Sequence, residues 1–179
     1  GVFFLLLILP AVNAEAKEVS LVKGDAIRYM GYSTHYYYVD GNLAFCLEPD
    51  MKSPGNGAYS ASELDPKSHL SKAMYYMYGG PGYEQYIKSS LTGGWGEDAN
   101  AYCLTHCVLS YIYDGCDQNS AAFKGLNADI ASAVVMYADY VKNLPDIPDA
   151  ELAFSENGLT AYYDREQKCQ RTQSIRLVG

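Results

Sequence analysis

Two short segments of the chain combine residue types that could do chemistry. The first is Phe45–Pro49, in which Cys46 stands at the end of a predicted strand and just before a loop rich in proline and glycine. The second is Tyr102–Gly115, which carries His106 within a predicted helix. A thiol becomes a nucleophile once it loses its proton, and an imidazole can accept a proton. These segments are therefore the candidates for a reactive site.

The chain has 5 cysteines, an odd number, so at least one thiol lies outside any intramolecular disulfide. Cys103 and Cys107 are one helical turn apart and, with His106, could ligate zinc, but no second ligand pair of the kind found in structural zinc sites is evident. We interpret the two cysteines as small residues packed on a helix, and we predict no metal and no cofactor. The sequence does not decide whether Cys103 or Cys107 forms a disulfide with Cys116, or Cys116 with Cys169.

Hydrophobic patterns predict the elements that position these residues. Asp40–Asn42 is a hairpin signal between Tyr36–Val39 and Leu43–Leu47, and the loop that follows spans Ser53–Gly57. Three helices are expected, and then strands return around a tight turn at Asn157-Gly158. The helices are Ser68–Tyr78, Asp98–Tyr113 and Ala128–Leu144, and the later strands are Ala150–Phe154, Leu159–Tyr163 and Gln170–Val178. Strands, then helices, then strands indicate an α+β domain.

Composition narrows the class of protein. With 13 Lys+Arg against 21 Asp+Glu, the net charge is −8, and an acidic chain without a basic stripe is a poor partner for nucleic acid. The apolar run Val2–Leu9, followed by Pro10 and small residues, predicts a signal peptide over residues 1–16, clipped at its start. No second apolar run of about 20 residues follows, so we expect an exported chain without a membrane span in this fragment.

The two candidate segments, with Ala73–Gly80 between them, resemble the thioester domains of Gram-positive surface adhesins, a family often named for its Thr-Gln-x-Ala motif. In that family an aromatic-Cys-x-Glu/Asp segment supplies a cysteine. A downstream helix supplies Thr-Gln, followed by apolar residues, an aromatic residue and often Asp-Gly. The resemblance runs from about residue 41 to the C-terminus. It implies a bacterial surface domain in which the cysteine and the glutamine form an internal thioester that a host amine opens.

This sequence departs from the family motif after Thr105, where His106 replaces the glutamine. Imidazole has no acyl carbon, so the family's crosslink cannot form between Cys46 and residue 106. If the fold brings these two residues together, a neighbouring imidazolium would lower the pKa of the thiol. Our hypothesis is a dyad with Cys46 as nucleophile and His106 as general base, oriented by Asp114 or Asn100.

We predict an α+β domain over residues 17–168, with a β-sandwich or sheet core and an inserted helical subdomain of about three helices. A linker or β-rich repeat domain is expected from residue 169. The expected function is that of an adhesin-type domain which binds a host or extracellular-matrix protein or glycan without the thioester. Glu48, Thr105 and Tyr37 are the candidate binding residues. Tyr37 is included because exposed tyrosine is enriched at recognition surfaces. A Cys–His acyl-transfer or hydrolase enzyme and a structural spacer are the alternatives. We expect a secreted protein, anchored to the bacterial cell wall and joined to further repeat domains.

Overall fold

The computed structural model describes residues 17–113 and 121–148, together with four short strands beyond residue 148. The chain divides into two compact units, residues 1–147 and 148–179. The predicted signal peptide and the predicted boundaries at residues 16 and 168 lie outside the described residues, so they stay predictions. None of the helices in the described part of the chain is long and apolar enough to cross a membrane.

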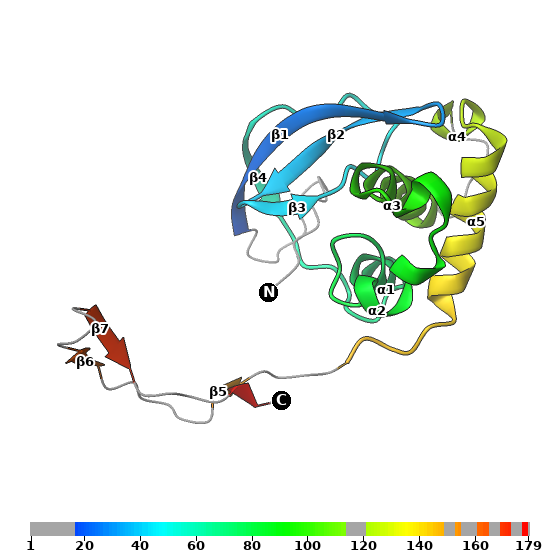
Figure 1. Ribbon diagram of the computed structural model, residues 1–179. Helices are drawn as coiled ribbons and strands as arrows, with labels where there is room; N and C mark the ends of the chain where they lie inside the picture. Colours follow the sequence, from blue (N-terminus) through cyan, green and yellow to red (C-terminus); the bar gives the residue numbers. More distant parts are fainter. Residues whose placement is uncertain are drawn as a thin grey trace. The chain divides into compact units, whose positions relative to one another are not determined.

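The first unit begins with a four-stranded antiparallel sheet in the order β3-β2-β1-β4 (Figure 1). Its strands are β1 Lys17–Tyr29, β2 Tyr32–Val39, β3 Asn42–Ala44 and β4 Gly57–Ala61. Asp40 and Gly41 both have positive φ, 49° and 80°, which is the backbone of the tight hairpin turn predicted from Asp40–Asn42. Two expectations were wrong. The strand expected to reach Leu47 ends at Ala44, and the loop expected to include Gly57 stops where β4 begins.

The three predicted helices are present. They are α1 His69–Tyr76, α3 Asp98–Tyr113 and α5 Ala128–Lys142, and only their ends differ from the prediction, by up to two residues. Ser68 is the N-cap of α1, and its side chain accepts from the N–H of Ser71; Asn127 is the N-cap of α5 and accepts from the N–H of Asp129. Besides β4, the sequence patterns missed four short helical elements. These are α2 Tyr83–Tyr86, α4 Ala121–Lys124 and 3-10 turns at Lys88–Ser90 and Gly93–Gly96.

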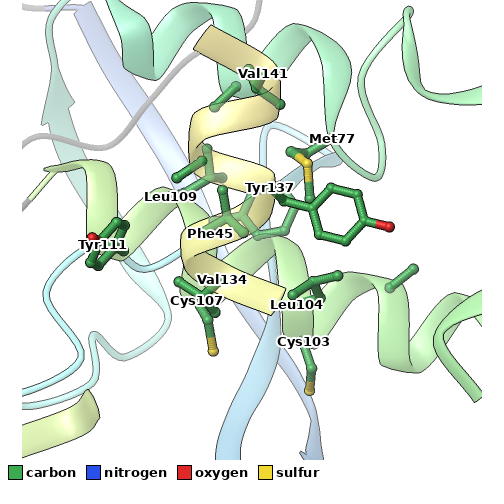
Figure 2. Close-up of a cluster of buried hydrophobic side chains, with 14 of the residues drawn as sticks. Phe45, Met77, Cys103, Leu104, Cys107, Leu109, Tyr111, Val134, Tyr137 and Val141 are labelled. Carbon is green, nitrogen blue, oxygen red and sulfur yellow. The ribbon is translucent and has the colours of Figure 1, made fainter. Parts of the chain in front are cut away.

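Helix α3 lies between the sheet and the other helices (Figure 1). Its residues from Ala101 to Tyr111 are all buried. Figure 2 draws Cys103 and Cys107 of this helix among the side chains of an apolar cluster that also holds Val134 and Val141 of α5. Both cysteines are 0% exposed, which agrees with their interpretation as packed residues. Burial of this stretch also places the polar side chains of Thr105, His106 and Ser110 inside the protein.

The second unit contains two separate strand pairs. β5 Ala153–Phe154 pairs with β8 Leu177–Val178, and β6 Ala161–Asp164 pairs with β7 Cys169–Thr172. The turn predicted at Asn157-Gly158 lies outside the described residues, and the described strands on either side of it, β5 and β6, pair with β8 and β7. The single strand expected from residue 170 to 178 is two strands. The α+β class is confirmed, and in the described residues of the first unit the sheet is one layer packed against helices.

Candidate functional site

Cys46 lies on a segment that buried neighbours hold in place. Phe45 and Leu47, on either side of it, are 9% and 5% exposed. The Phe45 ring stacks on the ring of Tyr102 from α3, with centroids 4.8 Å apart. The hydroxyl of Ser110, also on α3, donates to the backbone carbonyl of Cys46 at 3.2 Å. These contacts fix the thiol relative to α3 while leaving it partly exposed.

His106 lies in the middle of α3 and is 1% exposed. Aromatic rings surround its imidazole at centroid distances of 5.4 to 6.4 Å. They belong to Tyr32, Tyr37, Phe45 and Tyr102. Its Nδ1 lies 3.5 Å from the Tyr32 hydroxyl, a long hydrogen bond, and its Nε2 has no hydrogen-bond partner among the residues that the structure describes. The imidazole is therefore buried in an aromatic cage with little polar compensation.

The two predicted motifs meet in space. Cys46 and His106 line the same pocket, and the carbonyl of Cys46 is near enough to the imidazole to act on its pKa. The sequence places these residues sixty positions apart, and α3 brings them together because it packs under the strand that leads to Cys46. The Phe45–Tyr102 stack and the Ser110 hydrogen bond make this contact.

Burial sets the protonation state of both groups. It lowers the pKa of His106 from 6.5 to about 4, with a smaller opposing effect of the Cys46 carbonyl. Burial also raises the pKa of the Cys46 thiol, an effect that the hydrogen bond to the Glu48 carbonyl and the charge of Lys23 reduce. At neutral pH the site therefore holds a neutral imidazole and a protonated thiol. The hypothesis of a reactive Cys–His dyad stays a prediction, and this electrostatic setting works against an imidazolium–thiolate pair.

Two pockets border on Cys46. The larger has a volume of about 520 Å³ and the smaller about 390 Å³, both in the range typical of ligand sites. Four residues line both pockets and so form the wall between them. They are Tyr37, Cys46, Met51 and Ser53. The Tyr37 hydroxyl donates to the Ser53 hydroxyl at 3.2 Å, which ties the loop after Cys46 to the sheet.

The predicted binding residues fall in different places. Glu48 is exposed and lines the larger pocket, and Tyr37 lines both pockets although only 2% of its surface is accessible. Thr105 lines neither pocket. It is 1% exposed, and its hydroxyl accepts from the N–H of Tyr78 at 3.1 Å, so it joins α3 to the end of α1. Arg28 and the rim residue Met51 were not identified from the sequence, where neither belongs to a motif.

Zinc binding by Cys103 and Cys107 would need further ligands. Within the described ranges, no group of three or more His, Cys, Asp or Glu side chains is arranged to hold a metal ion. Burial raises the pKa of Cys103 to about 11, and it raises that of Cys107 as well, so both thiols stay protonated at neutral pH.

A comparison of the chain with known protein families finds a match. A family model described as "Thioester domain" matches residues 18–148, which include the sheet, helices α1 to α5, Cys46 and His106. No curated protein and no solved structure matches the chain. The family match covers about three quarters of the sequence and both halves of the site. The chain therefore belongs to the thioester-domain family.

Proposed function

We propose that this domain binds an extracellular ligand at the two pockets beside Cys46 and does so without an internal thioester. The observation that carries the proposal is the buried imidazole of His106 against the Cys46 backbone, at the place where the family's motif has glutamine. Thioester domains occur in extracellular surface proteins, and the predicted signal peptide agrees with that setting.

The chemistry of the thioester excludes the imidazole as a partner. To form the internal bond, the thiolate attacks the side-chain carbon of glutamine, and ammonia leaves. An imidazole offers no acyl carbon and no amide leaving group. Gln85 is the one glutamine in the continuous described ranges, and it is exposed on α2 and lines neither pocket. The structure thus supports a thiol that stays free.

The pockets supply what a non-covalent site needs. The larger combines apolar walls such as Leu21, Phe45 and Tyr59 with the charged side chains of Glu48 and Lys52 at its rim. Apolar walls with a few polar groups are typical of sites that hold a ligand by burial and orient it by hydrogen bonds. We propose a host or extracellular-matrix protein or glycan as the ligand, and a position on the bacterial cell wall for the protein.

Intact mass spectrometry tests the absence of the thioester. A thioester lowers the mass of the chain by about 17 Da, and methylamine opens it with a gain in mass. We expect the mass of the unmodified chain, with all described cysteines free, and no change on treatment with methylamine. A species lighter by the mass of ammonia, abolished by Cys46→Ala, would refute the proposal.

Binding to a panel of immobilised matrix proteins and glycans tests the site. We expect binding to survive Cys46→Ala and to be lost with Ser53→Arg, because a long charged side chain at residue 53 would fill the rim shared by both pockets. Ser62→Arg makes the same change at an exposed serine that lines neither pocket, and it should bind like the wild type. Equal binding by the Ser53 and Ser62 variants would place the ligand elsewhere.

A further inference from the structure

Strand β2 has an edge that its neighbour leaves uncovered. It spans Tyr32–Val39, but β3 pairs only with its last three residues, from Tyr37 to Val39. Within the described residues, the part from Tyr32 to Tyr36 therefore has a strand partner on one side only, namely β1. An uncovered strand edge presents backbone N–H and C=O groups to any chain that can extend beside it.

Hydrogen bonds show which backbone groups face this edge. The hydroxyl of Tyr102 donates to the carbonyls of His35 and Ala44, both at 2.9 Å. Ala44 belongs to β3, so the carbonyl of His35 points to the β3 side of β2 and away from β1. Backbone groups two residues apart along a strand point the same way, so those of Ser33 face this edge as well.

The smaller pocket reaches from β1, whose Ala26, Ile27 and Arg28 line it, across β2 to this edge. Three of its lining residues, Ser33, Thr34 and His35, belong to the uncovered part of β2. Others come from the segment after β3, which does not form a strand. They are Cys46, Pro49, Met51 and Ser53. The pocket is thus a slot of about 390 Å³ beside an open strand edge, with the imidazole of His106 in its wall.

The charge of the slot has one sign. Arg28 is the one residue with a permanent charge that lines it, whereas the larger pocket has both Glu48 and Lys52. Arg28 is exposed, and it forms no ion pair within the described part of the chain. A guanidinium without a partner, in a chain of net charge −8, is complementary to a carboxylate, which it can bind through two parallel hydrogen bonds.

We propose that the slot binds an extended peptide of the partner protein as an added strand on the edge of β2, and that a carboxylate of this peptide pairs with Arg28. The proposal rests on the proposed function, whose ligand it identifies as a peptide. Main-chain hydrogen bonds to the N–H and C=O of Ser33 and to the N–H of His35 would supply affinity, since the His35 carbonyl already accepts from Tyr102. Arg28 would select acidic sequences. Cys46 would lie beside the bound peptide without reacting with it.

The test uses defined peptides and the full chain. The probes are fluorescein-labelled heptapeptides of alternating threonine and valine, with one glutamate placed at each position in turn. Matched sets carry glutamine or lysine instead, or N-methylated amides at alternate positions. By fluorescence polarisation we expect the best glutamate peptide to bind at least about tenfold more tightly than its glutamine and N-methylated counterparts. Amide NMR shifts should centre on Ser33 and His35.

Charge reversal provides the matched variants. Arg28→Glu should weaken the glutamate peptide by at least about tenfold and favour the lysine peptide, whereas Lys67→Glu, the same change at an exposed site outside both pockets, should bind like the wild type. Both residues are exposed, so neither change removes a buried contact.

Three results would overturn the inference. The first is equal binding of the glutamate and lysine peptides, and the second is equal binding of the N-methylated and unmethylated peptides. The third is a set of amide shifts at Ser33 and His35 with glucuronate but with no peptide, which would make the slot a sugar-acid site. If no peptide binds while Ser53-dependent binding to the matrix panel persists, this inference fails and the proposed function stands. A thioester detected by mass spectrometry would instead refute the proposed function, while the peptide measurements would still test this inference.

Discussion

The buried His106 should make the stability of the domain depend on pH between neutral and mildly acidic conditions. Its imidazole is 1% exposed, and the titratable side chains in ring contact with it are Tyr32, Tyr37 and Tyr102. Burial raises the pKa of all three tyrosines, and it raises that of Cys46, so these neighbours are uncharged and cannot compensate a charge on the ring. Protonation of His106 in the folded protein is therefore unfavourable.

The sign and the size of the effect follow from the two pKa values. The unfolded chain binds a proton on this histidine near pH 6.5, and the folded chain does so only near pH 4. Between these values the unfolded state holds more protons, so the free energy of unfolding decreases as the pH falls. The full difference corresponds to about 3 kcal/mol, of which about 2 kcal/mol is lost between pH 7 and pH 5. For a domain of this size, that loss lowers Tm by about 5 to 10 °C.

Denaturant unfolding at several pH values measures this loss, and a variant isolates the contribution of one residue. Asparagine at position 106 keeps a polar side chain but cannot gain a proton, so His106→Asn should lower the stability at pH 7 and flatten the decrease between pH 7 and pH 5 by about 2 kcal/mol. His35→Asn makes the same change at a partly exposed histidine and controls for the loss of an imidazole. If His106→Asn and the wild type lose the same stability between pH 7 and pH 5, the reasoning is refuted.

Three more predictions follow from the contacts in the site. Cys46 should react with iodoacetamide more slowly than a free thiol at pH 7, and the pH midpoint of its reaction rate should be shifted upward. Cys103 should react only after unfolding. Mass spectrometry of the alkylated protein measures this, and a Cys46 that reacted as fast as glutathione would contradict the prediction. His106→Gln places an amide beside the Cys46 backbone, so a fraction of this variant should lose about 17 Da and regain mass with methylamine. The double variant that also carries Cys46→Ala should do neither. An unchanged mass of the single variant would contradict the proximity of the thiol to residue 106. Tyr102→Phe removes a hydroxyl that donates to two backbone carbonyls, and it should lower the free energy of unfolding by about 1 to 3 kcal/mol, which chemical denaturation would measure. A neutral effect would show that other groups satisfy these carbonyls.

The elements with strong local signals could be predicted from the sequence. Helix α3 has the bounds predicted for it, and the turn at Asp40-Gly41 has the positive φ values that its residue types favour. The burial of α3 on all sides could not be predicted, because it results from the sheet, α1 and α5 packing around it. Thr105 was predicted as a binding residue, yet it lies in the core.

The two halves of the site were predicted from motifs, but its pockets were not. Cys46 and His106 carry recognisable neighbours along the chain, and the resemblance to thioester domains indicated that they meet. Arg28 and Ser33 belong to no motif, and they become part of the site only because β3 pairs with three residues of β2 and leaves the rest uncovered. Sequence periodicity does not show where a strand loses its partner, because that depends on Phe45 and the residues after it leaving the sheet to pack on α3.

The histidine at position 106 changes what Cys46 can contribute to binding. In a thioester domain the affinity for the target can be modest, since one reaction makes the attachment permanent. Here the thiol is protonated at neutral pH and has no acyl partner at residue 106, so under the proposed function attachment depends on contacts that form and break. In that proposal the contacts come from the two pockets that Cys46 lines and from the open edge of β2. A ligand should therefore dissociate from the wild type and from Cys46→Ala at similar rates, whereas a ligand held by Cys46 would stay on the wild type alone.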